Sequence, residues 1–265
     1  MSTESWSVAA PQTIEVADVR SLTVRLTNGR AEVIADPSRA SGALVEVLDV
    51  SSRPLQVLAE HGSLRIAYDF PGVEGFVDRF RGLKDQDSAT VRVTVPSSTV
   101  LDVAAVGAEI VVTGGQGRVD AKTVSGALAV SGTSGTLATK SVSGPITVSE
   151  HAGDVTTATV SGSVALTGAL GRVTVNGVSG SVDVTADGTT PLVTVKTVSG
   201  SVGVHLDAGS PVNLRARSVT GKVVLDGVPV PSSAQRTVVV DHAEPGAAAY
   251  VSTNTVSGVA SVSRG

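Results

Sequence analysis

One tripeptide, Val-Ser-Gly, returns through most of the chain in a single register, and it limits the fold more than any other feature. It starts at residues 124, 142, 160, 178, 198 and 256, and a Val-Thr-Gly variant starts at residue 219. The first three steps between copies are 18 residues each, and the later steps are 20, 21 and 37 residues. An internal period of this length indicates an architecture of stacked repeats.

Apolar residues hold fixed places within each repeat, at +4, +6, +13, +15 and +18 from the valine. In the repeat that begins at Val160 they are Val164, Leu166, Val173, Val175 and Val178. Apolar pairs two residues apart are typical of a strand with one buried face. Each unit therefore supplies two short strands and two turns. We predict an all-β fold, a single-stranded parallel β-helix (β-solenoid) of about eight coils with roughly 18 residues per coil.

Two other β architectures compete with this prediction. An antiparallel sandwich also has frequent turns and alternating strands, but it does not require one pattern at a fixed register. A left-handed β-helix would need an apolar residue at +12, where the chain has Thr136, Asp154 and Arg172. The pattern favours a right-handed coil. The glycine two places after each valine predicts a bend with positive φ.

The period fades upstream of residue 101, which predicts a β-rich N-terminal region over 1–100 and solenoid repeats over 101–265. Strand-like runs lie at 21–26, 31–34, 44–47, 64–68 and 90–95. Asn28-Gly29, between the first two runs, predicts a tight hairpin. Because a solenoid exposes unpaired strand edges at its ends, we expect this region to begin or cap the stack.

A short amphipathic helix is predicted as an insert at 70–88. Its apolar residues are spaced as one helix face. They are Phe70, Val73, Phe76, Val77 and Phe80. The segment would either cover the end of the solenoid core or dock on a protein partner, and the second possibility makes these five residues candidates for partner binding.

A second candidate site is a column of cations two residues before the repeat valine. Its members are Lys122, Lys140, Lys196 and Arg217, and the column is interrupted by Ala158 and Asn176. Stacking would place equivalent side chains about 5 Å apart. The column would be either a solubilising edge or a stripe that binds an anionic partner such as acidic polysaccharide or lipid headgroups. The Ser and Thr residues beside it are expected to satisfy backbone groups of the turns.

No residue pattern names a reaction. Asp154, Asp183, Asp187 and Asp207 occupy different repeat positions and do not stack into an acid–base pair. The four histidines have no ligand-like spacing and are expected on the surface, and the chain has no cysteine. The glycine-rich turns lack the phosphate-loop form. We expect no catalytic residue, no cofactor and no metal site.

The charge and the apolar pattern restrict partners and location. A formal net charge of −4 gives no general reason to expect nucleic acid. No apolar stretch is long enough to span a membrane, and the first residues lack the features of a signal peptide. The expected location is the cytoplasm.

The Val-Ser-Gly series, entered through Val93-Thr94-Val95-Pro96 and Leu101-Asp102-Val103, resembles a bacterial β-strand-repeat family of unknown function known as "putative adhesin". The resemblance covers roughly residues 20–262. It implies a β-solenoid and says little about activity.

The expected function is a non-catalytic scaffold or protein-interaction module that binds a protein partner or self-associates through its ends. The alternative is an adhesin-like binder of carbohydrate or cell-envelope polymer. A carbohydrate-active enzyme is the least favoured possibility, because stacked carboxylates are missing from the sequence.

Overall fold

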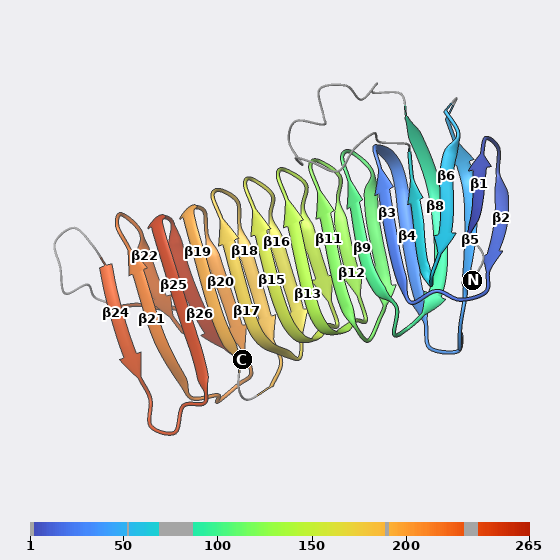
Figure 1. Cartoon of the computed structure of the whole chain (residues 1–265). Helices are drawn as coiled ribbons and strands as arrows, with labels where there is room; N and C mark the ends of the chain where they lie inside the picture. Colours follow the sequence, from blue (N-terminus) through green and yellow to red (C-terminus); the bar gives the residue numbers. More distant parts are fainter. Residues whose placement is uncertain (1–2, 52, 69–86, 189–190, 231–237) are drawn as a thin grey trace. The chain divides into compact units, whose positions relative to one another are not determined.

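The computed structural model describes residues 3–51, 53–68, 87–188, 191–230 and 238–265. Every helix or strand assigned within these ranges is a β-strand, which confirms the all-β prediction. The predicted helical residues Phe70, Val73, Phe76, Val77 and Phe80 lie outside the described residues. The chain divides into two compact units, residues 1–133 and 134–265, which are taken in turn (Figure 1).

The first unit contains twelve described strands. They are β1 (Glu4–Val8), β2 (Gln12–Val16), β3 (Ser21–Leu26), β4 (Asn28–Asp36), β5 (Ala43–Val50), β6 (Leu55–Glu60), β7 (Ser63–Ala67), β8 (Ser88–Pro96), β9 (Val100–Ala105), β10 (Glu109–Gly114), β11 (Arg118–Thr123) and β12 (Leu128–Ser131). One sheet has the order β1-β6-β7-β3-β9-β11, and the other has the order β2-β5-β8-β4-β10-β12.

The second unit contains fourteen described strands. They are β13 (Ser134–Ser141), β14 (Ile146–Ser149), β15 (Ala152–Thr159), β16 (Val164–Gly168), β17 (Leu170–Gly177), β18 (Val182–Ala186), β19 (Leu192–Ser199), β20 (Val202–Leu206), β21 (Val212–Ser218), β22 (Lys222–Leu225), β23 (Val228–Pro229), β24 (Val238–Ala243), β25 (Ala249–Ser257) and β26 (Val259–Arg264). The sheet orders are β13-β15-β17-β19-β25-β21-β24 and β14-β16-β18-β20-β26-β22-β23.

Within the second unit the repeat becomes parallel pairing at a fixed register. Ile146 pairs with Val164, Val164 with Val182, and Val182 with Val202. Alternate residues of each strand face the interior, where rows of Val, Leu and Ile are almost fully buried. β-branched side chains fit this pleated, buried surface, so the Val-rich composition matches the core.

Both units contain antiparallel pairs as well, so the sheets are mixed. In the first unit β1 pairs with β6 and β2 with β5. In the second unit β24 pairs with β21 and β23 with β22. Antiparallel strands therefore form the last ladders at these ends, and they cover edges that parallel repeats would leave unpaired.

The final repeat does not stack in sequence order. β25 lies between β19 and β21, and β26 lies between β20 and β22. The last two strands of the chain therefore lie between the β19–β20 pair and the β21–β22 pair, which both precede them in sequence (Figure 1). Equivalent repeats present nearly the same edge, so the period alone cannot specify which repeat is the neighbour of which.

The predicted Asn28-Gly29 hairpin is wrong. β3 pairs with β7 and β9, whereas β4 pairs with β8 and β10 in the other sheet. A type I′ turn needs positive φ at both central residues, but only Gly29 has it, at 102°. The dipeptide is a corner between two sheets.

Candidate functional site

The Val-Ser-Gly corners connect the two sheets, and their hydrogen bonds explain the residue types. The residue just before the valine is a buried Ser or Thr in several repeats, and its hydroxyl serves the corner. Ser141 Oγ donates to the carbonyl of Gly144 at 2.7 Å, and Thr159 Oγ1 accepts from the N–H of Gly162 at 3.0 Å. The next serine, Ser161, donates to the carbonyl of Val142 at 3.3 Å. Ser125, Ser179 and Thr220 make equivalent bonds, which confirms for these residues that the Ser and Thr ladder satisfies backbone groups of the turns.

Close approach, more than positive φ, explains the glycine column. Gly162 does not have positive φ, yet a Cβ there would lie 2.1 Å from the carbonyl oxygen of Gly144. Gly200 combines both constraints, with φ of 135° and a Cβ that would lie 2.1 Å from the oxygen of Gly180. The prediction of positive φ is thus correct for some corner glycines and wrong for others. Glycine is required at both kinds of corner because a Cβ would clash with the backbone of the neighbouring corner.

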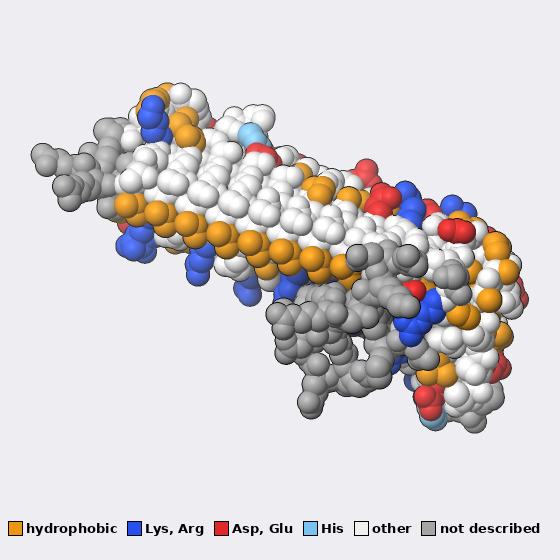
Figure 2. All heavy atoms as spheres, turned by 90° about the horizontal axis from the view of Figure 1, so that it is seen from above, with side chains coloured by type: hydrophobic (Ala, Val, Ile, Leu, Met, Phe, Trp, Pro, Cys, Tyr) orange, Lys and Arg blue, Asp and Glu red, His pale blue; other side chains and the backbone are white. Residues whose placement is uncertain are grey.

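The repeat valines themselves are exposed and form a continuous row, which we call the valine ridge. Their exposed fractions lie between 42% and 48%. In spatial order the ridge consists of Val142, Val160, Val178, Val198, Val256 and Val219. Figure 2 shows it as a line of hydrophobic side chains along the corners. Five steps at strand spacing give a length of about 24 Å.

The sequence pattern placed this valine among the apolar core positions, and its exposure follows from strand alternation. Positions +13, +15 and +17 face inward, as Leu137, Thr139 and Ser141 show. The following valine is one residue further along the chain and therefore faces outward at the corner. If the Ser or Thr before the valine is counted as an inward-facing position, the alternation of the strand predicts that the valine faces outward.

The cation column lies two residues from the ridge on the outer face of one sheet. Lys140, Lys196 and Arg217 are exposed, and they make no ion pair within the described residues. Lys140 pairs in register with Ala158, whereas Lys196 and Arg217 both lie opposite Asn254. The inserted strand β25 thus separates Lys196 from Arg217, so neutral residues space the cations and reduce their mutual repulsion.

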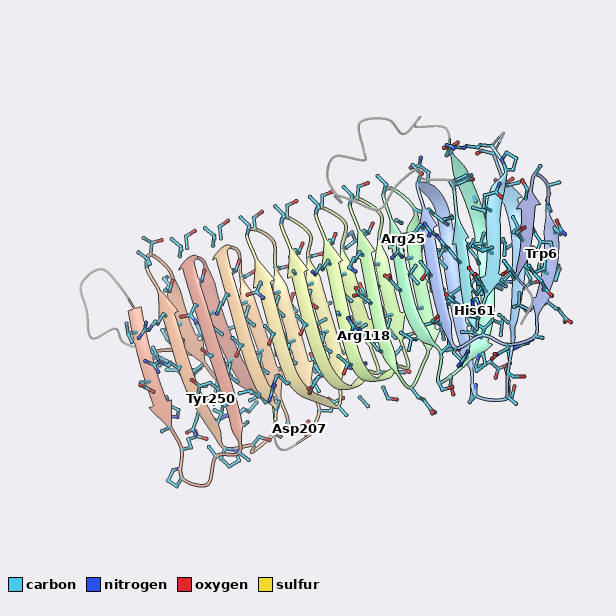
Figure 3. All side chains as sticks on the ribbon, in the orientation of Figure 1. Trp6, Arg25, His61, Arg118, Asp207 and Tyr250 are labelled. Atoms are coloured by element: carbon cyan, nitrogen blue, oxygen red, sulfur yellow. The ribbon has the colours of Figure 1, made fainter. Side chains whose placement is uncertain are left out.

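Lys122, the fourth predicted member of the column, lies in the first unit and has a different environment. Its ammonium is 3.0 Å from a carboxylate oxygen of Asp120 and 3.9 Å from one of Asp102. Asp102 is also paired with Arg25, which is labelled in Figure 3. Lys122 belongs to a network that neutralises it.

A shallow groove of about 430 Å³ lies beside the ridge, over β17, β19, β25 and β21 of the second unit. Its charged and amide lining residues are Lys196, Arg217, Asn176 and Asn254, and its apolar rim includes ridge valines. The lining offers hydrogen-bond donors and two cations but no carboxylate. Such a surface is suited to an anionic or hydroxyl-rich ligand rather than to acid–base chemistry.

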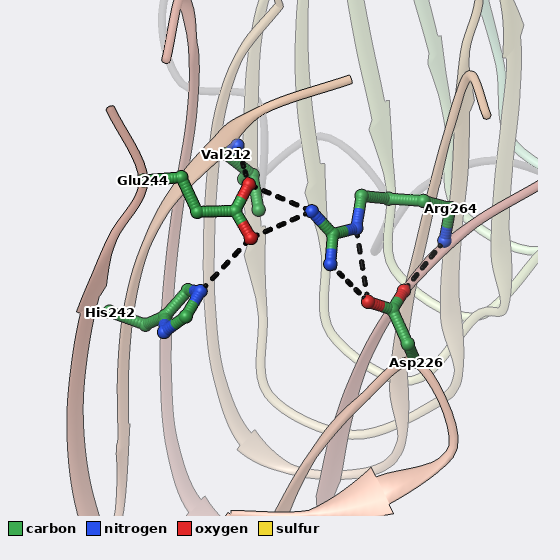
Figure 4. Close-up of polar contacts among 5 residues, drawn as sticks. All are labelled: Val212, Asp226, His242, Glu244 and Arg264. Atoms are coloured by element: carbon green, nitrogen blue, oxygen red, sulfur yellow. Dashed lines mark hydrogen bonds and ion pairs between the residues drawn. The ribbon is translucent and has the colours of Figure 1, made fainter. Parts of the chain in front are cut away.

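A polar cluster that the sequence pattern did not indicate holds the inserted C-terminal strand in the second unit (Figure 4). Arg264, at the end of β26, donates to both oxygens of Glu244 at 2.8 Å and also pairs with Asp226. Glu244 further accepts from the backbone N–H of Val212 at 2.9 Å and contacts His242 at 3.1 Å. The cluster joins β21, β22, β24 and β26, and we call it the C-terminal clasp.

Charge-assisted hydrogen bonds shift the pKa values of the clasp. The N–H of Val212, then His242 and Arg264, lower the pKa of Glu244 to about 2. The hydrogen bond from Arg264 likewise lowers the pKa of Asp226. Their carboxylates raise the pKa of Arg264 above its already high ordinary value. These groups are saturated with one another, which is the behaviour of a structural ion-pair network.

The histidines do not form a metal site. No group of three or more His, Cys, Asp and Glu side chains in the described ranges could hold a metal ion. His205 contacts Ser263 at 2.7 Å and His61 lies 3.4 Å from Glu60. The prediction that all four histidines are on the surface is wrong for His151, which is 1% exposed.

Among the described segments, no helix has the length and apolarity to cross a bilayer.

Comparisons with known proteins give distant likenesses in structure only. No family model matches the sequence, and no curated protein matches it significantly. A solved structure described as a "putative lipid binding protein" from Parabacteroides distasonis aligns over 98% of this chain and 98% of its own, at 14% identity and a TM-score of 0.49.

Two further solved structures carry an adhesion description. A "putative adhesin" from Bacteroides fragilis aligns over 96% of this chain and 97% of its own, at 11% identity and a TM-score of 0.39. A "putative cell adhesion protein" from Clostridium sporogenes covers 97% of this chain and 100% of its own, at 8% identity and a TM-score of 0.30.

Proposed function

We propose that this chain is a non-catalytic interaction module built as a β-solenoid, whose stacked repeats present identical side chains to a partner in straight rows. The observation that carries the proposal is the valine ridge with its neighbouring unpaired cations. An apolar row of this regularity on the surface is unusual unless something binds there.

The second unit supports a binding role more than a catalytic one. Several of its outward carboxylates are held by hydrogen bonds within the fold, as Asp226 and Glu244 are by Arg264. Asp154 accepts from the backbone N–H of Arg172 at 3.0 Å, where the register of the β15–β17 ladder shifts. General acid–base chemistry needs a carboxyl group poised next to a reacting group, and these three carboxylates are already hydrogen-bonded within the fold.

The module is tested by affinity capture with the full chain as bait. The test variant carries Val160→Asp and Val178→Asp on the ridge, and the control carries Thr147→Asp and Thr185→Asp on the other sheet. We expect one or more partners to be retained by the wild type and the control and lost by the ridge variant. Recovery of the same partners by all three baits would refute a ridge-based module.

A second candidate function is a binder of acidic carbohydrate or cell-envelope polymer, and the groove beside Lys196 favours it. Two cations and two amides in this groove match carboxylates and hydroxyls of such a polymer. A glycan array with wild type and Lys196→Gln tests this function. Binding of an acidic glycan by the wild type but not by the variant would support this function. If the wild type binds no glycan on the array, this function is refuted.

A further inference from the structure

The ridge and the cations together indicate which kind of partner the module binds. We propose that the valine ridge of the second unit, with Lys140, Lys196, Arg217 and Lys222 beside it, is a docking edge for the surface of an anionic lipid bilayer. This inference rests on the proposed interaction function and names the partner for the same surface.

The apolar part of the edge is uninterrupted. Six valines follow one another at strand spacing, each between 42% and 48% exposed. The corners that carry them, residues 141–145, 159–163, 177–181, 197–201, 218–221 and 255–258, contain no charged residue. Short aliphatic side chains on a protruding corner can enter the boundary between headgroups and acyl chains without exposing a charge to it.

The polar part of the edge is cationic and unsatisfied. Lys140, Lys196 and Arg217 each stand two residues from a ridge valine, and Lys222 follows the corner of Val219 directly. None of these four is in an ion pair with another described residue. Long basic side chains beside an apolar strip can reach lipid phosphates while their stems lie along the strip.

The opposite edge of the second unit has the opposite charge. Glu150, Asp187 and Asp207 each occupy the turn that directly follows a strand of the second sheet, and none of them is in an ion pair with another described residue. Figure 3 shows Asp207 in one of these turns, on the side away from the corners. An anionic surface would attract the ridge edge and repel this acidic edge, so the charge distribution orients the unit as well as binding it.

Charge complementarity also favours a bilayer over a second copy of the chain. Two ridges packed against each other would bring Lys140, Lys196 and Arg217 near their own copies, and the corners supply no carboxylate to pair with them. A straight row about 24 Å long fits a flat, compliant surface along its whole length.

The experiment is vesicle flotation with the full chain. One set of vesicles is phosphatidylcholine alone, and the other mixes equal amounts of phosphatidylcholine and phosphatidylserine. We expect binding to the mixed vesicles only, and weaker binding as the salt concentration rises. Lys140→Gln with Lys196→Gln should weaken binding about 25-fold, since each cation near an anionic surface contributes roughly fivefold.

Two matched variants isolate the edge. Arg172→Gln with Arg215→Gln removes the same charge from the same sheet face away from the ridge, and its binding should change far less. Val160→Ser with Val178→Ser should reduce binding several-fold at unchanged charge, whereas Leu192→Ser, which alters an exposed apolar residue elsewhere, should not. Circular dichroism confirms that each variant is folded.

The possible outcomes separate this inference from the interaction function. Absence of vesicle binding, equal binding to both vesicle types, or equal loss in the ridge and control variants overturns the lipid inference. If the chain does not bind vesicles but captures a protein or an acidic glycan through the ridge, the interaction function stands and the lipid partner is wrong. Dimerisation that is lost in the valine variant, without vesicle binding, assigns the ridge to self-association. If nothing binds through the ridge, both proposals fall.

Discussion

The two units use the same kind of strand stack but differ in how the cations on the outer face of the first sheet are paired. In the first unit Arg25, Asp102 and Lys122 form a network across β3, β9 and β11. Arg30 pairs with Glu109 at 2.7 Å and Arg92 with Glu32 at 3.1 Å, so these charges form ion pairs between strands. In the second unit the cations beside the ridge have no described carboxylate partner. Charge that is not used to hold strands together remains available to a ligand.

The repetition of the sequence explains part of this difference. The first unit has few repeats, so individual opposite charges can be placed on neighbouring strands. In the second unit equivalent positions carry similar residues, and an opposite charge at the same position is rare. When equivalent residues of successive repeats stack on one another, they form rows of similar side chains on the surface. Such rows suit extended partners.

The largest expected effect tests what the two units share, the glycine corner. Gly200→Ala should lower the free energy of unfolding by about 3 kcal/mol, because the new Cβ would clash with backbone at a strained φ. Gly126→Ala in the first unit should act similarly, since its Cβ would lie 1.9 Å from the oxygen of Ala108.

Urea denaturation followed by circular dichroism measures the glycine effect. Gly177→Ala is the control, because its Cβ would approach nothing closer than 3.5 Å and its φ is not positive. It should change stability by less than about 1 kcal/mol. Equal effects at residues 177 and 200 would mean that the corners are not as closely stacked as described.

The C-terminal clasp should give the next largest effect. Arg264→Met leaves two carboxylates without their cation, and we expect a loss of about 2 kcal/mol in unfolding free energy. In the first unit Arg25→Met should cost less, because Lys122 remains near Asp102 at 3.9 Å. Urea denaturation of both variants decides the comparison, and a larger loss for Arg25→Met would reverse it.

Acid should weaken the second unit through the same clasp. The pKa of Glu244 is lowered from 4.5 to about 2, so its contribution to stability is complete above pH 4.5 and is lost as the pH falls toward 2. Thermal melts of the wild type and Glu244→Gln over this range test the claim. The variant should start less stable and lose less on acidification, and parallel curves would contradict the assignment.

The sequence predicts the regular part of the molecule well, for a physical reason. The apolar alternation of a strand is a local pattern, so the spacing of Val164 and Leu166 alone predicts that they are core residues. The order of stacking is not local. Nothing in the 249–264 stretch shows that its strands insert between two earlier pairs of strands, because its pattern fits beside any of them.

The candidate site was predicted only in part for the same reason. The column of Lys140, Lys196 and Arg217 follows from the repeat, but the separation of Lys196 from Arg217 by Asn254 depends on the inserted strand. The ion pairs of Lys122 and the clasp around Arg264 join residues distant in sequence. Such contacts have no periodic signal.

A smaller effect separates paired from unpaired cations. Lys122→Gln should lower the unfolding free energy by about 0.5–1 kcal/mol, because it breaks contacts with Asp120 and Asp102. Lys196→Gln should change it by less than about 0.3 kcal/mol, since no described carboxylate is lost. Chemical denaturation at low and high salt measures both, and only the first difference should shrink with salt. Equal losses would show that the two units do not differ in how they use these charges.

The smallest expected effect concerns the ridge itself, and it decides whether the valines are there for stability. Val178 is 48% exposed, so Val178→Thr removes little buried apolar area and should change the unfolding free energy by less than about 0.5 kcal/mol. Val184 is fully buried, and Val184→Thr places a hydroxyl in the core, which should cost about 1–3 kcal/mol. Urea denaturation of the two variants side by side gives the ratio. A large loss at Val178 would mean that the ridge packs against part of the chain itself, and its availability to a partner would then be refuted.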